Sequence, residues 1–148
     1  MGILSRLFGS QAHAEERGWI VKTGTKAGKK LFVRKNNGAG TVANRKTFNY
    51  RLGFAFPLNS PNQNGDPSQG ELAELNKIED LLVERLEKHE NALQVLAIRG
   101  PGFQEYVFYV KEEFAKNWSE KETLASIKSH KVQSYREKDA DWTVYYSM

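Results

Sequence analysis

Apolar and polar residues alternate along residues 48–58, the clearest periodic pattern in the chain. An apolar residue at every second position predicts a β-strand with one buried face. Residues from about 68 to 89 show helical spacing instead, with an apolar stripe formed by Leu72, Leu75, Ile78, Leu82 and Leu86. Residues 92–98 are almost wholly apolar and predict a strand that is buried on both faces.

The second half of the chain continues this order. Ser119 and Glu122 have the spacing of a capping box, which predicts a second helix carrying Leu124 and Ile127. The other expected elements are a turn at residues 99–102, strands at residues 103–111 and 131–136, and a tail at residues 139–148 that contains Trp142, Val144, Tyr145 and Tyr146.

The residues before this region are rich in glycine, asparagine and lysine. Two short β-type runs, residues 19–23 and 31–34, flank a glycine-marked turn and predict a hairpin. Residues 36–47 predict a flexible linker, and residues 1–9 predict a short helix with Ile3, Leu4, Leu7 and Phe8 on one face.

From residue 48 the expected order is strand, helix, strand, strand, helix, strand. This is the order of the ferredoxin-like split βαβ fold (β-α-β-β-α-β), in the α+β class. We therefore expect an α+β core domain of residues 48–148, with this sheet and a C-terminal aromatic tail. A basic N-terminal segment of residues 1–47, with a short helix, a β-hairpin and a linker, precedes it.

The expected sheet is apolar on both faces, because residues 92–98 and 103–110 carry apolar side chains in both alternations. A sheet with helices on one side normally presents polar residues on the other. The second face therefore needs a cover, which could be the hairpin with Trp19, the tail with Trp142 or a second subunit. The residues expected in the core are Phe54, Phe56, Ile78, Leu82, Val95, Leu96 and Phe108.

Composition excludes several classes of site. The 148 residues include no cysteine, which excludes disulfides, thiolate zinc sites, iron–sulfur clusters and cysteine nucleophiles. No apolar run approaches the roughly 18 residues of a membrane span. The histidines, His13, His89 and His130, lie in the expected N-terminal tail and at two helix ends, without metal-ligand spacing. We expect no metal and no cofactor.

The charge is uneven along the chain. The net charge is +4, but residues 1–64 hold 11 basic and 2 acidic residues, and residues 65–148 hold 11 basic and 16 acidic residues. Three interpretations are open for the basic part: its lysine and arginine side chains keep it solvated, they pack against the acidic part, or they bind nucleic acid. Residues 99–106 also match an RNA-recognition strand at its basic, glycine and aromatic positions, although Pro101 and Gln104 depart from it. The candidate RNA-binding residues are Lys29, Lys30, Arg34, Lys35, Arg99 and Phe103.

Several segments together resemble the bacterial family called domain of unknown function 695. They are residues 51–58, 65–67, 75–82 with Ile78-Glu79-Asp80, 105–109, 132–133 and 141–145, so the resemblance covers about residues 48–146. No chemistry is established for that family. Some of its members lie beside a ribonuclease-regulator type of domain, which implies an adaptor or regulatory role by analogy.

Our first functional hypothesis is a cytoplasmic binding or regulatory module without catalysis, whose partner is another protein; a homodimer is a further possibility. The expected groove is formed by Glu79, Arg99, Glu105, Tyr109, Gln133, Trp142 and Tyr145. The second hypothesis is an RNA-binding or ribonuclease-regulating module. The third is a small hydrolase that uses Glu79, Glu105 or Tyr109.

Overall fold

The computed structural model describes residues 18–148, so the short helix expected in residues 1–9 lies outside the described residues. The strands are β1 (Trp19–Lys26), β2 (Lys29–Asn36), β3 (Tyr50–Pro57), β4 (Ala92–Gly100), β5 (Phe103–Val110) and β6 (Gln133–Lys138). The helices are α2 (Val42–Thr47), α3 (Gln69–Leu86), α4 (Glu112–Asn117), α5 (Glu120–Ala125) and α6 (Thr143–Ser147), and a 3₁₀ turn spans Lys88–Glu90.

The strands form one six-stranded sheet in the order β1-β2-β4-β5-β3-β6, and every neighbouring pair is antiparallel. The α+β class is therefore confirmed. The order of the whole sheet differs from that of a four-stranded ferredoxin-like sheet, because Phe32–Lys35 of β2 pair with Leu96–Arg99 of β4. This pairing adds the hairpin to the sheet as two further strands.

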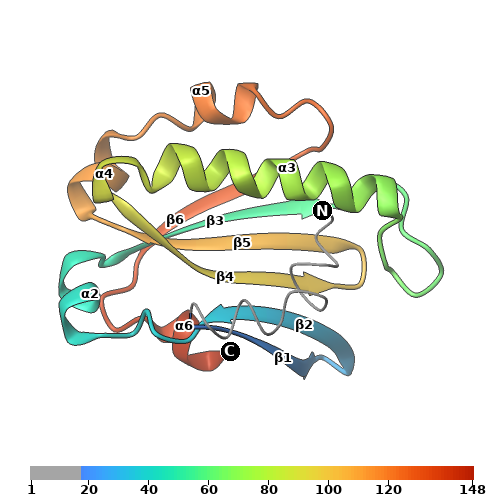
Figure 1. Cartoon of the computed structure of the whole chain (residues 1–148), viewed down its shortest axis with the longest axis horizontal. Coiled ribbons are helices and arrows are strands. Elements are labelled where there is room, and N and C mark those ends of the chain that lie inside the picture. The colour runs from blue at the N-terminus through green and yellow to red at the C-terminus, as the bar shows by residue number, and fades with distance from the viewer. Residues whose placement is uncertain (1–17) are drawn as a thin grey trace.

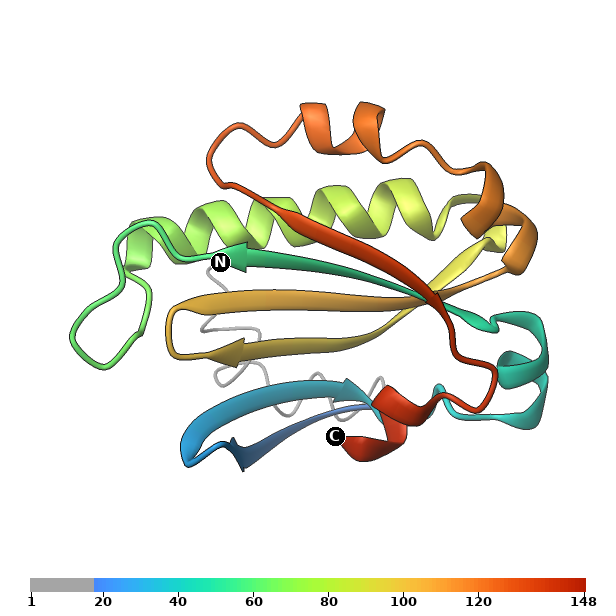
Figure 2. The same cartoon turned by 180° about the vertical axis from the view of Figure 1, so that it is seen from behind.

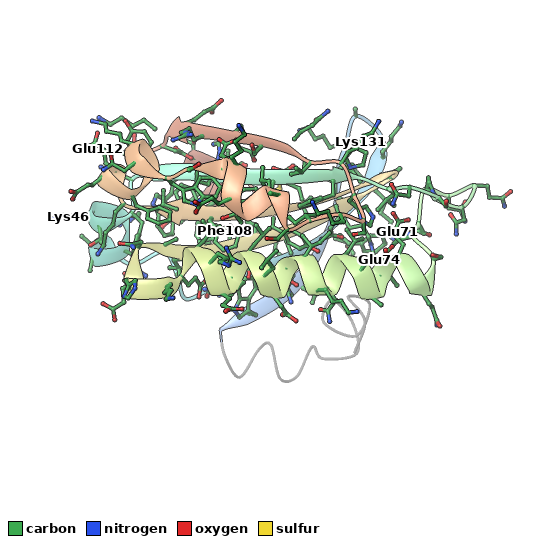
Figure 3. All side chains as sticks on the ribbon, turned by 90° about the horizontal axis from the view of Figure 1, so that it is seen from above. Lys46, Glu71, Glu74, Phe108, Glu112 and Lys131 are labelled. Carbon is green, nitrogen blue, oxygen red and sulfur yellow. The ribbon has the colours of Figure 1, made fainter. Side chains whose placement is uncertain are left out.

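One face of the sheet, here called the α3 side, packs against α3, α4 and α5 (Figures 1 and 2). Directly opposed residues of antiparallel strands share a face, so Leu52, Phe54 and Phe56 lie beside Phe108, Tyr106 and Gln104. The Phe54 ring stands edge-on to Phe108 at 6.0 Å and to Trp118 at 5.7 Å between centroids. Figure 3 shows Phe108 in the space between α3 and α5.

The opposite face, here called the α6 side, contains a second apolar cluster in which Trp142 and Tyr145 pack on Val33, Leu96, Val107 and Tyr109. The expected cover by the tail is therefore present. The hairpin extends the sheet at its edge, and the register places Trp19 on the α3 side, where the Arg34 guanidinium lies 4.9 Å from its ring. All seven residues expected in the core are buried.

Three local predictions need correction. Residues 42–47 form α2, because Thr41 accepts a hydrogen bond from the backbone N–H of Asn44 at 3.1 Å and caps the helix. Two short helices, α4 and α5, replace the single second helix. Ser119 precedes α5 as expected, but its side chain makes no capping bond.

The helix α3 begins at Gln69, close to its expected start near residue 68. The Ser68 hydroxyl accepts from the backbone N–H of Glu71 at 3.2 Å. The helix ends at Leu86, and the following turn contains His89 and Glu90 in the left-handed region, with φ of 59° and 56°. This conformation is unfavourable for both residues and stops the helix before its expected end near residue 89.

We expect Phe54→Ala to lower the free energy of unfolding by about 3–5 kcal/mol, because the ring is fully buried between two other aromatic rings. Urea denaturation monitored by circular dichroism measures this loss. The control is Glu74→Ala, at an exposed position of α3. It is expected to change the free energy of unfolding by less than about 0.5 kcal/mol. A loss under 1 kcal/mol for Phe54→Ala contradicts the packing described.

Gln104 gives a second test of the same layer. Its side chain is fully buried, and neither amide atom has a partner among residues 18–148. Gln104→Leu is therefore expected to raise the free energy of unfolding by about 1 kcal/mol, since it removes an uncompensated buried amide. The matched control is Gln94→Leu. The Gln94 amide donates a hydrogen bond to Glu79 at 2.8 Å, so losing that bond is expected to lower the free energy of unfolding. Equal destabilisation by both substitutions would contradict this account.

Candidate binding groove

Among residues 18–148, α6 covers only part of the α6 side, because it has five residues and lies near the ends of β1 and β2 (Figure 2). A recess of about 260 Å³ remains between the hairpin, α6 and β6. We call this recess the groove. Its lining residues are Lys26, Leu31, Arg51, Ile98, Phe103, Glu105, Tyr135, Val144, Ser147 and Met148. Most of the floor is apolar, and the polar groups gather where β5, β3 and β6 lie side by side.

The polar end is built around a contact that crosses a strand. Tyr135 lies on β6 and Glu105 on β5, with β3 between them, and the Tyr135 hydroxyl donates to the Glu105 carboxylate. Gly53 is directly opposite Tyr135 on β3, and a Cβ placed there would lie 1.9 Å from the tyrosine ring. Glycine at this position therefore allows the ring to lie across β3 and reach Glu105.

The electrostatics of this contact keep the phenol protonated. Burial, the hydrogen bond to Glu105 and the negative charge of Glu105 together raise the pKa of Tyr135, although Arg51 opposes the shift. The Tyr135 hydroxyl is therefore a neutral donor at physiological pH. The bond fixes the position of the Glu105 carboxylate and leaves its negative charge in place.

Arg51 occupies the third polar position. Its guanidinium donates to Glu137 at 2.6 Å and to Asp139 at 3.1 Å, and it lies 5.5 Å from the centroid of the Tyr135 ring. Two carboxylates thus bind one cation, so Arg51 links β3 to β6 and to the start of the tail.

The wall of the groove is α6, which is held by the buried carboxylate of Asp139. This carboxylate accepts from the backbone N–H of Thr143 at 2.9 Å, from the Thr143 hydroxyl at 2.8 Å and from the Tyr109 hydroxyl at 2.7 Å. Trp142 stacks on Tyr109 at 4.3 Å between centroids, and its indole N–H donates to the Phe48 carbonyl at 2.6 Å. The tail is therefore fixed to the sheet by polar and aromatic contacts together.

Asp139 remains ionised because of these bonds. Burial alone would raise the pKa of Asp139, but the hydrogen bonds from Thr143, Tyr109 and Val144 outweigh it and hold the pKa below its usual value. Burial and the bond to Asp139 in turn raise the pKa of Tyr109. The pair is thus a carboxylate and a neutral phenol near pH 7.

The structure divides the seven residues predicted for the groove between two faces. Glu105, Tyr109, Gln133, Trp142 and Tyr145 lie on the α6 side, where Glu105 lines the groove and Tyr109, Trp142 and Tyr145 support its wall. Gln133 is exposed on β6 outside the lining. Glu79 and Arg99 lie on the α3 side, where Glu79 binds Arg34 and Gln94.

The candidate RNA-binding residues lie in several separate places. Lys29 and Lys30 are exposed at the hairpin, while Arg34 and Arg99 are buried on the α3 side. On the α6 side, Lys35 lies 4.3 Å from the Tyr145 ring and donates to the main-chain oxygen of Met148 at 3.2 Å, and Phe103 lines the groove. The hydrolase candidates are also divided, because Glu79 lies on the opposite face from Glu105 and Tyr109.

His130 has a structural role that the sequence did not indicate. It lies beyond the end of α5, and its buried Nε2 is 2.6 Å from the Glu71 carboxylate. Glu71 also accepts from the backbone N–H of Asn59 at 2.6 Å. Burial would raise the pKa of Glu71, but the bonds from Asn59, His130 and Ser60 lower it overall. The pair ties the loop after β3 to the segment before β6.

The groove residues that sequence reasoning missed are Arg51, Tyr135 and Asp139, together with Gly53. The signal available was Gly53 itself, since a glycine inside a strand of aromatic residues marks the close approach of another group. The strand partner that approaches it is set by the β3–β6 register, which joins residues about 80 positions apart.

Comparison with known proteins places this fold in a family. A model of a family of unknown function, DUF695, matches residues 17–148, and the chain therefore belongs to that family. No curated protein and no solved structure matches the chain significantly. Within residues 18–148, no helix is long and apolar enough to cross a membrane, and no three histidine or acidic residues cluster as metal ligands would.

We expect Asp139→Asn to lower the free energy of unfolding at pH 7 by about 2 kcal/mol, because a charged acceptor of several hydrogen bonds is lost. The pKa of Asp139 is lower in the folded than in the unfolded chain. Its stabilising effect is therefore present above the unfolded pKa of about 4 and is lost as the pH falls through the folded value.

The difference between the wild type and Asp139→Asn should accordingly shrink as the pH falls below about 4. Urea denaturation at pH 7 and pH 3, followed by tryptophan fluorescence, measures both differences. Asp141→Asn is the matched control, because Asp141 is exposed and two residues away. A difference that is the same at both pH values would show that the Asp139 charge does not hold α6.

Proposed function

We propose that the protein is a cytoplasmic binding or regulatory module without catalysis, and that its groove takes up a segment of another protein. The observation that carries this proposal is the groove itself, an apolar recess in a sheet face that is otherwise covered. The lining residues Phe103, Val144 and Met148 are only half-buried, so removing their apolar surface from water by docking a partner is favourable. The wall made by α6 is fixed in advance, which lowers the entropic cost of binding.

The size and chemistry of the groove support a protein segment over the other two hypotheses. Its volume of about 260 Å³ lies below the roughly 300–1,000 Å³ of typical small-molecule pockets, and it is bounded by strands and a short helix. The candidate RNA-binding side chains are divided between two faces and the hairpin tip. The candidate hydrolase residues do not converge on one recess.

We propose that residues 48–148 form the core domain and that the accessory hairpin of β1 and β2 completes the groove with Lys26 and Leu31. We further propose that residues 50–138 form a ferredoxin-like split βαβ unit extended by the hairpin. The order β4-β5-β3-β6 within the sheet, with α3 between β3 and β4 and with α4 and α5 between β5 and β6, supports this assignment.

A groove-filling substitution tests the proposed function. Ser147 is exposed and lines the groove, so Ser147→Trp is expected to occupy it without entering the core. A phage-displayed library of random peptides is selected on the wild type, and the enriched peptides are measured against both proteins. We expect Ser147→Trp to weaken their binding at least about tenfold, because the added indole competes for the same apolar floor.

The matched control is Ala73→Trp, which adds the same side chain at an exposed position of α3, on the other side of the sheet. Its affinity for the peptides should stay within about twofold of the wild type. Equal binding by Ser147→Trp and the wild type would contradict the groove as the site. Tight binding of single-stranded RNA that weakens steeply with salt would instead favour the second hypothesis.

A further inference from the structure

We propose that the groove selects a segment in which a lysine or arginine follows an apolar residue, and that Glu105 binds the basic side chain. This inference rests on the proposed function. It assigns a specificity-determining role to Glu105 and identifies the partner by its charge.

The first argument is the distribution of charge among the groove residues. Arg51 is bound by Glu137 and Asp139 and is therefore not available to an acidic partner. Glu105 makes no ion pair with any residue in 18–148, and within that range its side chain accepts a hydrogen bond from the neutral Tyr135 hydroxyl alone. The third charged lining residue, Lys26, also makes no ion pair with Glu105. The polar end of the groove thus presents a carboxylate that no cation among the described residues binds directly.

The second argument is that the acceptor is already in position. The Tyr135 hydroxyl binds Oε2 of Glu105, and Oε1 has no partner among the described residues. Because Tyr135 is itself held over Gly53, the carboxylate needs little reordering when a cation arrives. A charge held in this way is a specific acceptor for an ammonium or guanidinium group.

The third argument concerns the stem of a basic side chain. Ile98 lies directly opposite Glu105 on β4, and Phe103 lies on the same face two residues earlier on β5. Lysine and arginine bury an aliphatic stem along apolar surface while their charged end remains at a polar group. Ile98 is itself buried, so the half-buried Phe103, on the same face as Glu105, offers the apolar surface for such a stem.

The experiment uses three peptides as probes: acetyl-Leu-Lys-Leu-amide and the same peptide with norleucine or with glutamate in place of lysine. Norleucine keeps the aliphatic stem and lacks the charge. Titrations followed by amide chemical shifts in ¹H–¹⁵N spectra report affinity, location and folding together. On the wild type we expect the lysine peptide to bind about fivefold more tightly than the norleucine peptide, and the glutamate peptide to bind most weakly.

Two variants assign the preference to Glu105. Glu105→Gln removes the charge, retains an acceptor for Tyr135, and should abolish the difference between lysine and norleucine. Tyr135→Phe removes the bond that holds Glu105 and should reduce the difference. Lys29→Gln is the control, because it removes a charge at an exposed hairpin position outside the groove lining and should preserve the preference.

The outcomes separate the two proposals. Equal binding of the lysine and norleucine peptides to the wild type, with loss of both in Ser147→Trp, would overturn the role of Glu105 and leave the groove as a binding site. An unchanged lysine preference in a folded Glu105→Gln variant would also overturn it. Failure of all three peptides to shift groove resonances, together with failure of the peptide selection, would overturn the proposed function.

Discussion

The wall of the groove depends on one buried carboxylate, that of Asp139. A helix of five residues is not stable in isolation, and the first N–H groups of α6 need an acceptor. Asp139 supplies that acceptor and at the same time binds Tyr109 and Arg51 on the sheet. The stacking of Trp142 on Tyr109, the position of Arg51 and the shape of the recess all follow from this attachment.

The main layers of the fold can be predicted from local patterns in the sequence. The alternation around Phe54 and Phe56 identifies the buried face of β3, and the stripe with Ile78 and Leu82 identifies the buried face of α3. Strands that are apolar on both faces also predict a second cover, which α6 partly provides. These features are predictable because each depends on residues that are close together in sequence and on the simple requirement to bury apolar area.

The groove could not be predicted in the same way, because its contacts join distant parts of the chain. Tyr135 meets Glu105 only through the register of three strands, and Asp139 meets Tyr109 across 30 positions. Glu79 and Glu105 both looked suitable for one site, but the pairing of β4 and β5 with the sheet puts them on opposite faces. The pairing of the hairpin with β4 could not be predicted from local sequence either, because it depends on β4 offering an open edge of the sheet.

The close approach of Tyr135 to Gly53 couples two positions in the course of evolution. A side chain at position 53 would occupy the space of the tyrosine ring, so a chain with this fold could acquire one only if residue 135 became small or its ring moved away. Such an exchange would keep β3 and β6 paired but remove the hydroxyl that reaches Glu105. Homologous chains would then divide into two groups: those with glycine opposite tyrosine would retain a fixed acid on the open face, and those with the exchange would lose it while keeping the sheet.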